Sequence, residues 1–399
     1  MRGFLPFLLA LFVIAAVLRV DFFFTIVYLL SLVYLLSRLW VRYSIKRLQV
    51  QRRFVDHAFS GDRVSVEIRM RNSGRLPVPW LEVHESLPVE LAAPPFYNEV
   101  ISLGGRSQHS FSYYLNCYRR GYYTIGPLTL QSGDLLGITT RAQIELASEH
   151  IIVYPKILPL QELGLPTHSP LAVLRARSPL FEDPARVTGV RDYRMGDSMR
   201  RIHWTATAST GHLLVKQYQP AIARETLICL DLDRQDYGQR QLYTATELAI
   251  VAAASLANHI IVREGLPAGL STEAWDPLLD RQARFSLPPR PERSHLMSIL
   301  EVLARVQLAD AGDFEELLRQ ESLKLPWGAT MAIITGRESE PLFDNMVHLR
   351  RSGFAVALLL IQPGRPSPEL RKRADMLGVP VYRIWKAEEL DAALQEAQR

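Results

Sequence analysis

Residues 3–37 read GFLPFLLALFVIAAVL-RVD-FFFTIVYLLSLVYLLS, two uncharged apolar runs that are interrupted by Arg19-Val20-Asp21. As one helix, this stretch would exceed the ~30 Å hydrocarbon core of a bilayer and would bury two charged side chains near its centre. Two short spans with the charges at their turn avoid that cost. We therefore predict a transmembrane helical hairpin over residues 1–45, with the lipid bilayer as a partner. A cleaved signal peptide ending near Ala15-Ala16 is the alternative.

Positive charge is concentrated beside these runs. Residues 1–53 hold eight Lys or Arg against the single acid Asp21, which gives +7; the whole chain carries +5, so the remainder sums to −2. Because five of the basic residues follow the second run between Arg42 and Arg53, the positive-inside rule places that flank in the cytoplasm. We expect a multi-pass protein of the inner (plasma) membrane with cytoplasmic soluble domains, and no nucleic-acid partner.

Residues 50–160 change to a period of two. Val64, Val66, Ile68 and Met70 alternate with polar residues, which is typical of a half-buried strand. Further strands are expected at Leu81–Glu85, Ser110–Tyr118, Tyr122–Ile125, Leu128–Leu130 and Ile151–Tyr154. Several short strands without a helical stretch predict an immunoglobulin-like β-sandwich.

Residues 225–399 alternate between apolar runs and helical periods. Strands are expected at Thr226–Leu232, Pro267–Ser271, Ala329–Thr335, Phe354–Ile361 and Val381–Trp385. Helices are expected at Leu242–Arg263, Arg293–Val306, Phe314–Leu323, Leu342–Arg351, Pro368–Leu377 and Ala387–Glu396. This alternation predicts an α/β domain with a doubly wound parallel sheet, whose ligands would bind at the carboxyl ends of the strands. Since no glycine-rich phosphate loop follows a strand, we expect no nucleotide cofactor.

A linker over residues 161–224 joins the two domains and contains GVRDYRMGDSMRRIHW at 189–204. Here the sequence resembles the bacterial, membrane-anchored family called domain of unknown function fifty-eight. Its hallmark, roughly R-x-Y-x-x-G-D-x-x-R-x-I-x-W, is matched by Arg191, Tyr193, Gly196, Asp197, Arg200 or Arg201, Ile202 and Trp204. The resemblance implies a C-terminal sheet similar to a von Willebrand factor A domain, and a MoxR-type AAA+ ATPase as protein partner.

The hallmark is the candidate partner-binding segment. Its candidate residues are Arg191, Tyr193, Arg194, Gly196, Asp197, Arg200, Arg201, His203 and Trp204. We expect Asp197 to cap a short helix over Ser198–Trp204, which would display the arginines for carboxylate or phosphate groups of a partner. The alternative is internal pairing of these arginines with Asp192, Asp197 or acids of the sheet, which would dock the linker onto the sandwich or the sheet. His203 is either a proton carrier or a packed, hydrogen-bonded side chain.

A degenerate metal site is the second candidate. The resemblance implies a D-x-S-x-S motif after the first strand, where this chain has Asp231, Asp233 and Gln235, and Thr335 stands in place of a later acid. Asp231, Asp233 and Thr335 could hold Mg²⁺ together with water; otherwise we expect no cofactor. In the alternative, the two acids cap the following helix.

Three functions follow from these patterns. The first is a non-enzymatic, membrane-anchored interaction or scaffold protein that works with a MoxR-type ATPase in the assembly or remodelling of protein complexes. The second is a metal-dependent, adhesion-type binding module built on Asp231 and Asp233. The third is a hydrolase using Asp197 and His203, against which stands the lack of a nucleophile elbow or H-E-x-x-H motif.

Overall fold

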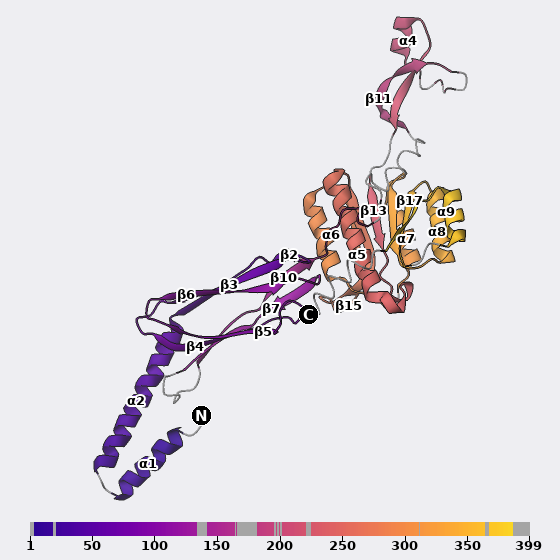
Figure 1. Cartoon of the computed structure of the whole chain (residues 1–399). Coiled ribbons are helices and arrows are strands. Elements are labelled where there is room, and N and C mark those ends of the chain that lie inside the picture. Colours follow the sequence, from indigo (N-terminus) through magenta and orange to yellow (C-terminus); the bar gives the residue numbers. More distant parts are fainter. Residues whose placement is uncertain are drawn as a thin grey trace. The chain divides into compact units, whose positions relative to one another are not determined.

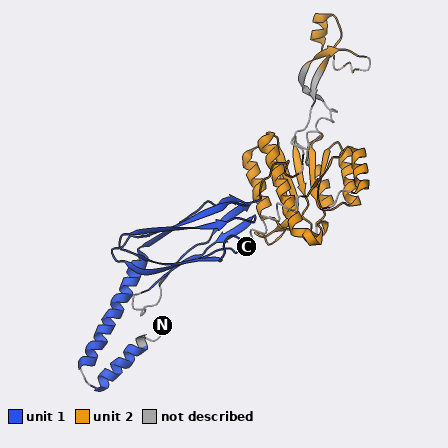
Figure 2. Ribbon diagram, in the orientation of Figure 1, with its two compact units in different colours: residues 1–155 blue, residues 156–399 orange. Residues whose placement is uncertain are grey.

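The computed structural model describes residues 4–18, 21–133, 142–163, 165, 182–194, 197, 199, 202–220, 225–310, 312–363 and 367–385. The chain divides into two compact units, residues 1–155 and 156–399 (Figure 2). Each unit has its own sheets and core, so each is described by itself.

Two apolar helices begin unit 1: α1 (Phe4–Leu18) and α2 (Asp21–Lys46). The 26 residues of α2 extend over about 39 Å, which is long and apolar enough to cross a membrane, whereas α1 is a shorter apolar helix. Most large apolar side chains of both helices are exposed. A third apolar stretch, Gln239–Arg263, also has the length to span but is largely buried in unit 2. Arg19, predicted at the turn, lies outside the described residues.

The rest of unit 1 is a β-sandwich. One sheet has the order β1 (Leu48–Arg53), β3 (Arg63–Asn72), β6 (Gln108–Asn116), and another has β2 (His57–Phe59), β10 (Glu149–Tyr154), β7 (Gly121–Ile125). The third has β5 (Phe96–Leu103), β4 (Val78–Ser86), β8 (Leu128–Ser132), β9 (Ala142–Leu146). The alternation in β3 buries Val64, Val66, Ile68 and Met70 in the core, as predicted. Strands β1, β2, β5 and β9 were missing from the prediction.

Unit 2 contains a doubly wound sheet. Its strands are β13 (Thr226–Leu230), β14 (Ala268–Asp276), β15 (Arg281–Arg290), β16 (Thr330–Thr335), β17 (Ala355–Ile361) and β18 (Val381–Ile384). In the order β15-β14-β13-β16-β17-β18, all are parallel except the edge strand β15 (Figure 1). Strand β15 was not predicted; it contains Pro288 and Pro289, which are tolerated at a sheet edge.

Helices cover this sheet. They are α5 (Leu242–Asn258), continued by a π-helical turn at His259–Arg263, α6 (Arg293–Arg305), α7 (Phe314–Ser322), α8 (Glu340–Arg351) and α9 (Pro368–Leu377). Helices α7, α8 and α9 share one apolar core with the strands. All seven residues of β17 are buried, as expected for a strand that is covered on both faces. The predicted closing helix Ala387–Glu396 lies outside the described residues.

A separate two-stranded sheet precedes β13. It pairs β11 (Glu182–Asp192) with β12 (Leu214–Pro220), and the helix α4 (Trp204–Thr210) lies between them in sequence (Figure 1). The predicted linker therefore contains an ordered hairpin, here called the hallmark hairpin (residues 182–220).

Candidate functional site

The hallmark hairpin is held by backbone pairing and by a small apolar centre. Ile202 forms an isolated antiparallel bridge with Val215, and the His203 amide donates to the Leu214 carbonyl oxygen at 2.8 Å. Among the described residues of the hairpin whose burial is assigned, Ile202 and Val215 are the buried apolar side chains. The hallmark thus returns the chain from β11 to β12 through α4.

Arg191 and Asp197 form a two-pronged ion pair. Arg191 donates from Nη1 to Asp197 Oδ2 at 2.7 Å and from Nη2 to Oδ1 at 2.8 Å, and the Arg194 amide donates to Oδ2 at 2.9 Å. The internal pairing foreseen as an alternative is therefore present for Arg191. Because Asp197 faces the Arg191 guanidinium and the Arg194 amide, the pKa of its carboxyl group is lowered to about 2.

The helix predicted around Ser198–Trp204 includes residues that lie outside the described ones, so its capping by Asp197 stays a prediction. The described helix α4 starts at Trp204, and its cap is His203, whose Nδ1 accepts from the Ala206 amide at 3.1 Å. Asp197 is bound to Arg194 by its backbone as well, since the Asp197 amide donates to the Arg194 carbonyl oxygen at 3.0 Å. His203 is thus engaged in a packed, hydrogen-bonded role, which does not call for proton transfer.

Asp197 is expected to stay ionised down to about pH 2, which carbon NMR of its labelled carboxyl group would measure. A folded-state pKa below the unfolded value near 3.9 contributes stability above pH 4, which is lost as the pH falls through the folded value. In the control Arg191→Gln, the pKa should move back toward the unfolded value. A wild-type pKa near 4 would contradict the ion pair.

The outer surface of the hallmark hairpin is apolar and basic. Trp204 is 67% exposed, Met199 is 73% exposed, and Leu213 and Arg194 are also exposed. Tyr193 is half-buried and its amide donates to the Leu213 carbonyl oxygen. Three further predicted residues, Gly196, Arg200 and Arg201, lie outside the described residues.

At the sheet, Asp231 and Thr335 come together as predicted. They end neighbouring parallel strands, and Thr335 Oγ1 donates to Asp231 Oδ2 at 2.6 Å. Asp231 Oδ1 accepts from the Asp233 amide at 3.0 Å. Burial, together with the nearby carboxyl group of Asp236, raises the pKa of Asp231 well above its usual value. Asp231 is therefore a buried acid that is biased toward its neutral form.

Asp233 takes a capping role beside it. Its Oδ1 accepts from the Gln235 amide at 2.9 Å and its Oδ2 from the Gly312 amide at 3.0 Å, so it caps the 3₁₀ turn Arg234–Asp236. Within the described residues, no group of three or more His, Cys, Asp or Glu side chains is arranged to hold a metal ion. The alternative of acids that cap the following turn accounts for the geometry of Asp233.

A hollow of about 510 Å³ lies beside these acids. It is lined by Asp236, Tyr237, Gly336, Arg337 and Glu338, among others, and Arg337 pairs with Asp236 at 2.8 Å. A Cβ atom on Gly336 would lie 2.4 Å from the Tyr237 ring, so this close approach requires glycine. The hollow lies near the switch point between β13 and β16, where ligands of doubly wound sheets bind.

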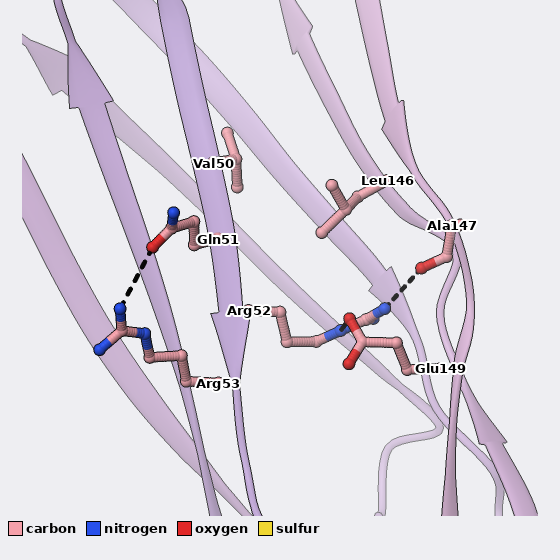
Figure 3. A pocket seen from close by; sticks show the side chains of 7 residues that line it. All are labelled: Val50, Gln51, Arg52, Arg53, Leu146, Ala147 and Glu149. Carbon is pink, nitrogen blue, oxygen red and sulfur yellow. Dashed lines mark hydrogen bonds and ion pairs between the residues drawn. The ribbon is translucent and has the colours of Figure 1, made fainter.

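Sequence analysis missed a buried charged cluster in the sandwich. The side chains of Arg52 and Glu85 are both 0% exposed and form an ion pair, and Tyr113 donates to Glu85 Oε2 at 2.6 Å. Arg52 also donates to the Ala147 carbonyl oxygen at 2.6 Å and to Glu149 at 3.1 Å (Figure 3). Arg52 was counted with the basic membrane flank, and that assignment is wrong because its side chain points into the core.

Comparisons with known proteins show similarity to one protein family. Residues 189–322 match the family model described as "Protein of unknown function DUF58". The uncharacterized protein YeaD of Bacillus subtilis is 22% identical over 301 residues, which cover 74% of this chain and 70% of that protein. The CARDB domain of a Pyrococcus furiosus protein is 18% identical with a TM-score of 0.20, over 27% of this chain and 91% of that structure. A cohesin module from Clostridium perfringens is 16% identical with a TM-score of 0.22, over 27% of this chain and 96% of that structure. The family resemblance predicted from the hallmark is confirmed over residues 189–322.

Proposed function

We propose, from the similarity of this chain to the DUF58 family and from its own structure, that it is a membrane-anchored interaction protein. In this proposal α1 and α2 both enter the inner (plasma) membrane, and the sandwich and sheet domains lie in the cytoplasm. The length of α2 and the exposed basic residues that follow its apolar part support this topology. The protein acts by binding a partner, without catalysis of its own.

We further propose that the two folded domains belong to known binding folds. The sandwich is of the immunoglobulin-like type, and the sheet of unit 2 is of the von Willebrand factor A type. The parallel order with a single antiparallel edge strand, β15, supports the second assignment, as does the position of Asp231 after the first strand. Both folds occur in many binding proteins. A fold alone does not determine a function, so the function is argued from the site.

The observation that carries the proposal is the surface of the hallmark hairpin. A two-stranded hairpin is marginally stable by itself in water and gains from packing against a further surface. Here Trp204 and Met199 remain exposed, and Arg194 of the same hairpin is exposed as well. Exposed tryptophan and arginine side chains are the residue types that dominate binding energy at protein interfaces. We therefore assign the hallmark hairpin as the partner-binding surface.

The partner that the family resemblance implies is a MoxR-type AAA+ ATPase, and the process is the assembly or remodelling of protein complexes. A membrane tether raises the local concentration of each component, so that weak contacts at the hairpin become effective. The fork between Arg191 and Asp197 supports this by fixing the turn that precedes Met199.

Replacing Met199 and Trp204 together with alanine is expected to lower recovery of the ATPase at least about tenfold, because both side chains would be buried at the interface. The measurement is co-purification of a tagged MoxR-type ATPase with the full-length chain from membranes. The matched control is Leu323→Ala with Met376→Ala, two apolar side chains that are 83% and 79% exposed in unit 2. Recovery that is equal in wild type, variant and control would exclude the hallmark hairpin as the binding surface.

A further inference from the structure

Six exposed basic side chains gather at one end of unit 1. They come from the end of α2 and the residue after it, from the end of β3 and the β3–β4 turn that follows it, and from the turn between β5 and β6. We name this set the headgroup collar, and its members are Arg42, Lys46, Arg47, Arg71, Arg75 and Arg106. Sequence analysis found only the first three, because the other three are brought to the helix by the fold of the sandwich.

Backbone hydrogen bonds bring the two turns to the end of the helix. The amide and the hydroxyl group of Ser73 donate to the Arg47 carbonyl oxygen at 3.0 Å and 2.7 Å. The Arg106 amide donates to the Gly74 carbonyl oxygen at 2.8 Å. A Cβ atom on Gly74 would lie 3.2 Å from Arg47 Cβ, which shows how closely the turn approaches α2. The collar is therefore one continuous surface within one compact unit.

The helix sets the depth of this surface. From Asp21 to Trp40, α2 rises about 30 Å, which equals the thickness of the hydrocarbon core. Trp40 donates from Nε1 to the Pro77 carbonyl oxygen at 2.9 Å, so the β3–β4 turn lies level with this residue. Arg42 to Arg47 then lie about 3–10 Å farther along the axis, a range that includes the headgroup layer of about 5–8 Å on each side of the core.

Within the described residues, the charges of the collar have no ion-pair partner, in contrast to Arg69, which pairs with Glu67 at 2.7 Å. Residues 40–49, 71–77 and 103–109, which form this surface, include no Asp or Glu. Arg47 lies over the Tyr43 ring at 5.8 Å, and with Trp40 this forms an aromatic pair of the kind found at membrane interfaces.

We propose that the headgroup collar binds the phosphate groups of anionic phospholipids and seats the end of the sandwich in the headgroup layer. The inference rests on the proposed membrane span of α2. Arginine forks match phosphate oxygens, and basic groups at this depth are attracted to an anionic leaflet. The sandwich is thereby fixed against the bilayer, which leaves unit 2 to engage its partner.

The test compares wild type with the variant R71Q/R75Q/R106Q, which changes only the end of β3 and the two sandwich turns and leaves α2 intact. Full-length protein is reconstituted into vesicles that contain phosphatidylcholine and a minority of phosphatidylglycerol. Native mass spectrometry then counts the phosphatidylglycerol molecules that each protein retains. The wild-type preference for phosphatidylglycerol over phosphatidylcholine is expected to fall about tenfold in the variant.

Two controls separate folding and general charge from the collar. R281Q/R293Q/R371Q removes the same charge from exposed positions of unit 2 and is expected to keep the wild-type preference. R71K/R75K/R106K keeps the charge and is expected to recover most of the preference. If wild type and R71Q/R75Q/R106Q both float with the vesicles and retain phosphatidylglycerol equally, the proposed lipid binding by the collar is contradicted. The proposed membrane anchor is then still supported. Wild-type protein that does not float with vesicles overturns the anchor, and the collar with it.

Discussion

Replacing Glu85 with alanine is expected to destabilise the β-sandwich by about 3–5 kcal/mol, the usual cost of breaking a buried ion pair by removing one partner. The Arg52 guanidinium would remain in the core with only the Ala147 and Ile125 carbonyl oxygens and the half-exposed Glu149 as partners. The Tyr113 hydroxyl group, which donates to Glu85, would lose its acceptor as well. Both losses act on groups that water cannot reach.

Hydrogen exchange of the full-length protein would measure this loss in peptides from β4 and β6. The matched control is Glu67→Gln, which breaks the solvent-exposed pair with Arg69 and is expected to change exchange far less, because water screens that pair. The double replacement Arg52→Met with Glu85→Leu should recover much of the stability, since it leaves no unpaired charge in the core. If Glu85→Ala exchanges like wild type, the pair does not hold the sandwich together.

The position of Arg52 illustrates what the sequence can and cannot predict. Composition places Arg52 and Arg53 together in a basic flank, yet Arg52 is buried and Arg53 is exposed. The signal that could have separated them is the period of two in β1, in which Leu48, Val50 and Arg52 share the inward face. The partner Glu85 is 33 residues away along the chain, so no local pattern identifies the pair.

Long apolar runs were predictable because their burial is decided locally. The prediction of helix α9 at Pro368–Leu377 matches the structure residue for residue, with Ser367 as its cap. Strands β16 and β17 are also as predicted, to within one residue at their starts. Edge strands β5 and β15 were missed, since half of their residues are exposed and almost none is fully buried, so that neither contains the apolar run that marks a central strand.

The candidate sites were also predictable only in part. The contact between Asp231 and Thr335 could be predicted, because the carboxyl ends of neighbouring parallel strands lie at the same edge of the sheet. The pairing of Arg191 with Asp197 was one of two open alternatives, and the geometry of the turn decides it. The cap at His203 was not foreseen, because the helix propensity of the hallmark gives no reason to begin α4 after Ile202. The basic surface at Arg75 and Arg106 depends on two turns that are distant in sequence.

Replacing Asp231 with alanine is expected to destabilise the sheet of unit 2 by about 2–5 kcal/mol. The Thr335 hydroxyl group and the Asp233 amide would both lose their acceptor, and each unsatisfied buried group costs about 1–3 kcal/mol. Asp231→Asn is the matched variant, because it keeps a carbonyl oxygen for the Asp233 amide and cannot ionise, while its amide nitrogen faces the Thr335 hydroxyl group, whose oxygen can accept. Its free energy of unfolding should be much closer to that of wild type. Thermal unfolding of the full-length protein, followed by exchange in β13 and β16, would measure both changes.

The pH dependence of the same pair of proteins tests the state of the buried acid. A folded-state pKa above the unfolded value means that the native state binds the proton more tightly than the unfolded state. The folding stability that Asp231 contributes is therefore lost as the pH rises above about 4, the unfolded value. Wild type should therefore lose stability relative to Asp231→Asn as the pH is raised from that value. A difference that does not change with pH would contradict a raised pKa.

Titration of the full-length protein with Mg²⁺ by calorimetry decides between the neutral acid and the metal-dependent alternative. A cation needs the ionised carboxylate, so binding must displace the proton of Asp231 and compete with the Thr335 and Asp233 hydrogen bonds. We expect wild type and Asp231→Asn to give the same heat. Heat that is present in wild type, grows with pH and disappears in Asp231→Asn would instead favour a metal-dependent binding module. In that case Asp231 would exchange its proton for a cation, and the hollow lined by Asp236 would be the surface where a partner's acid completes the site.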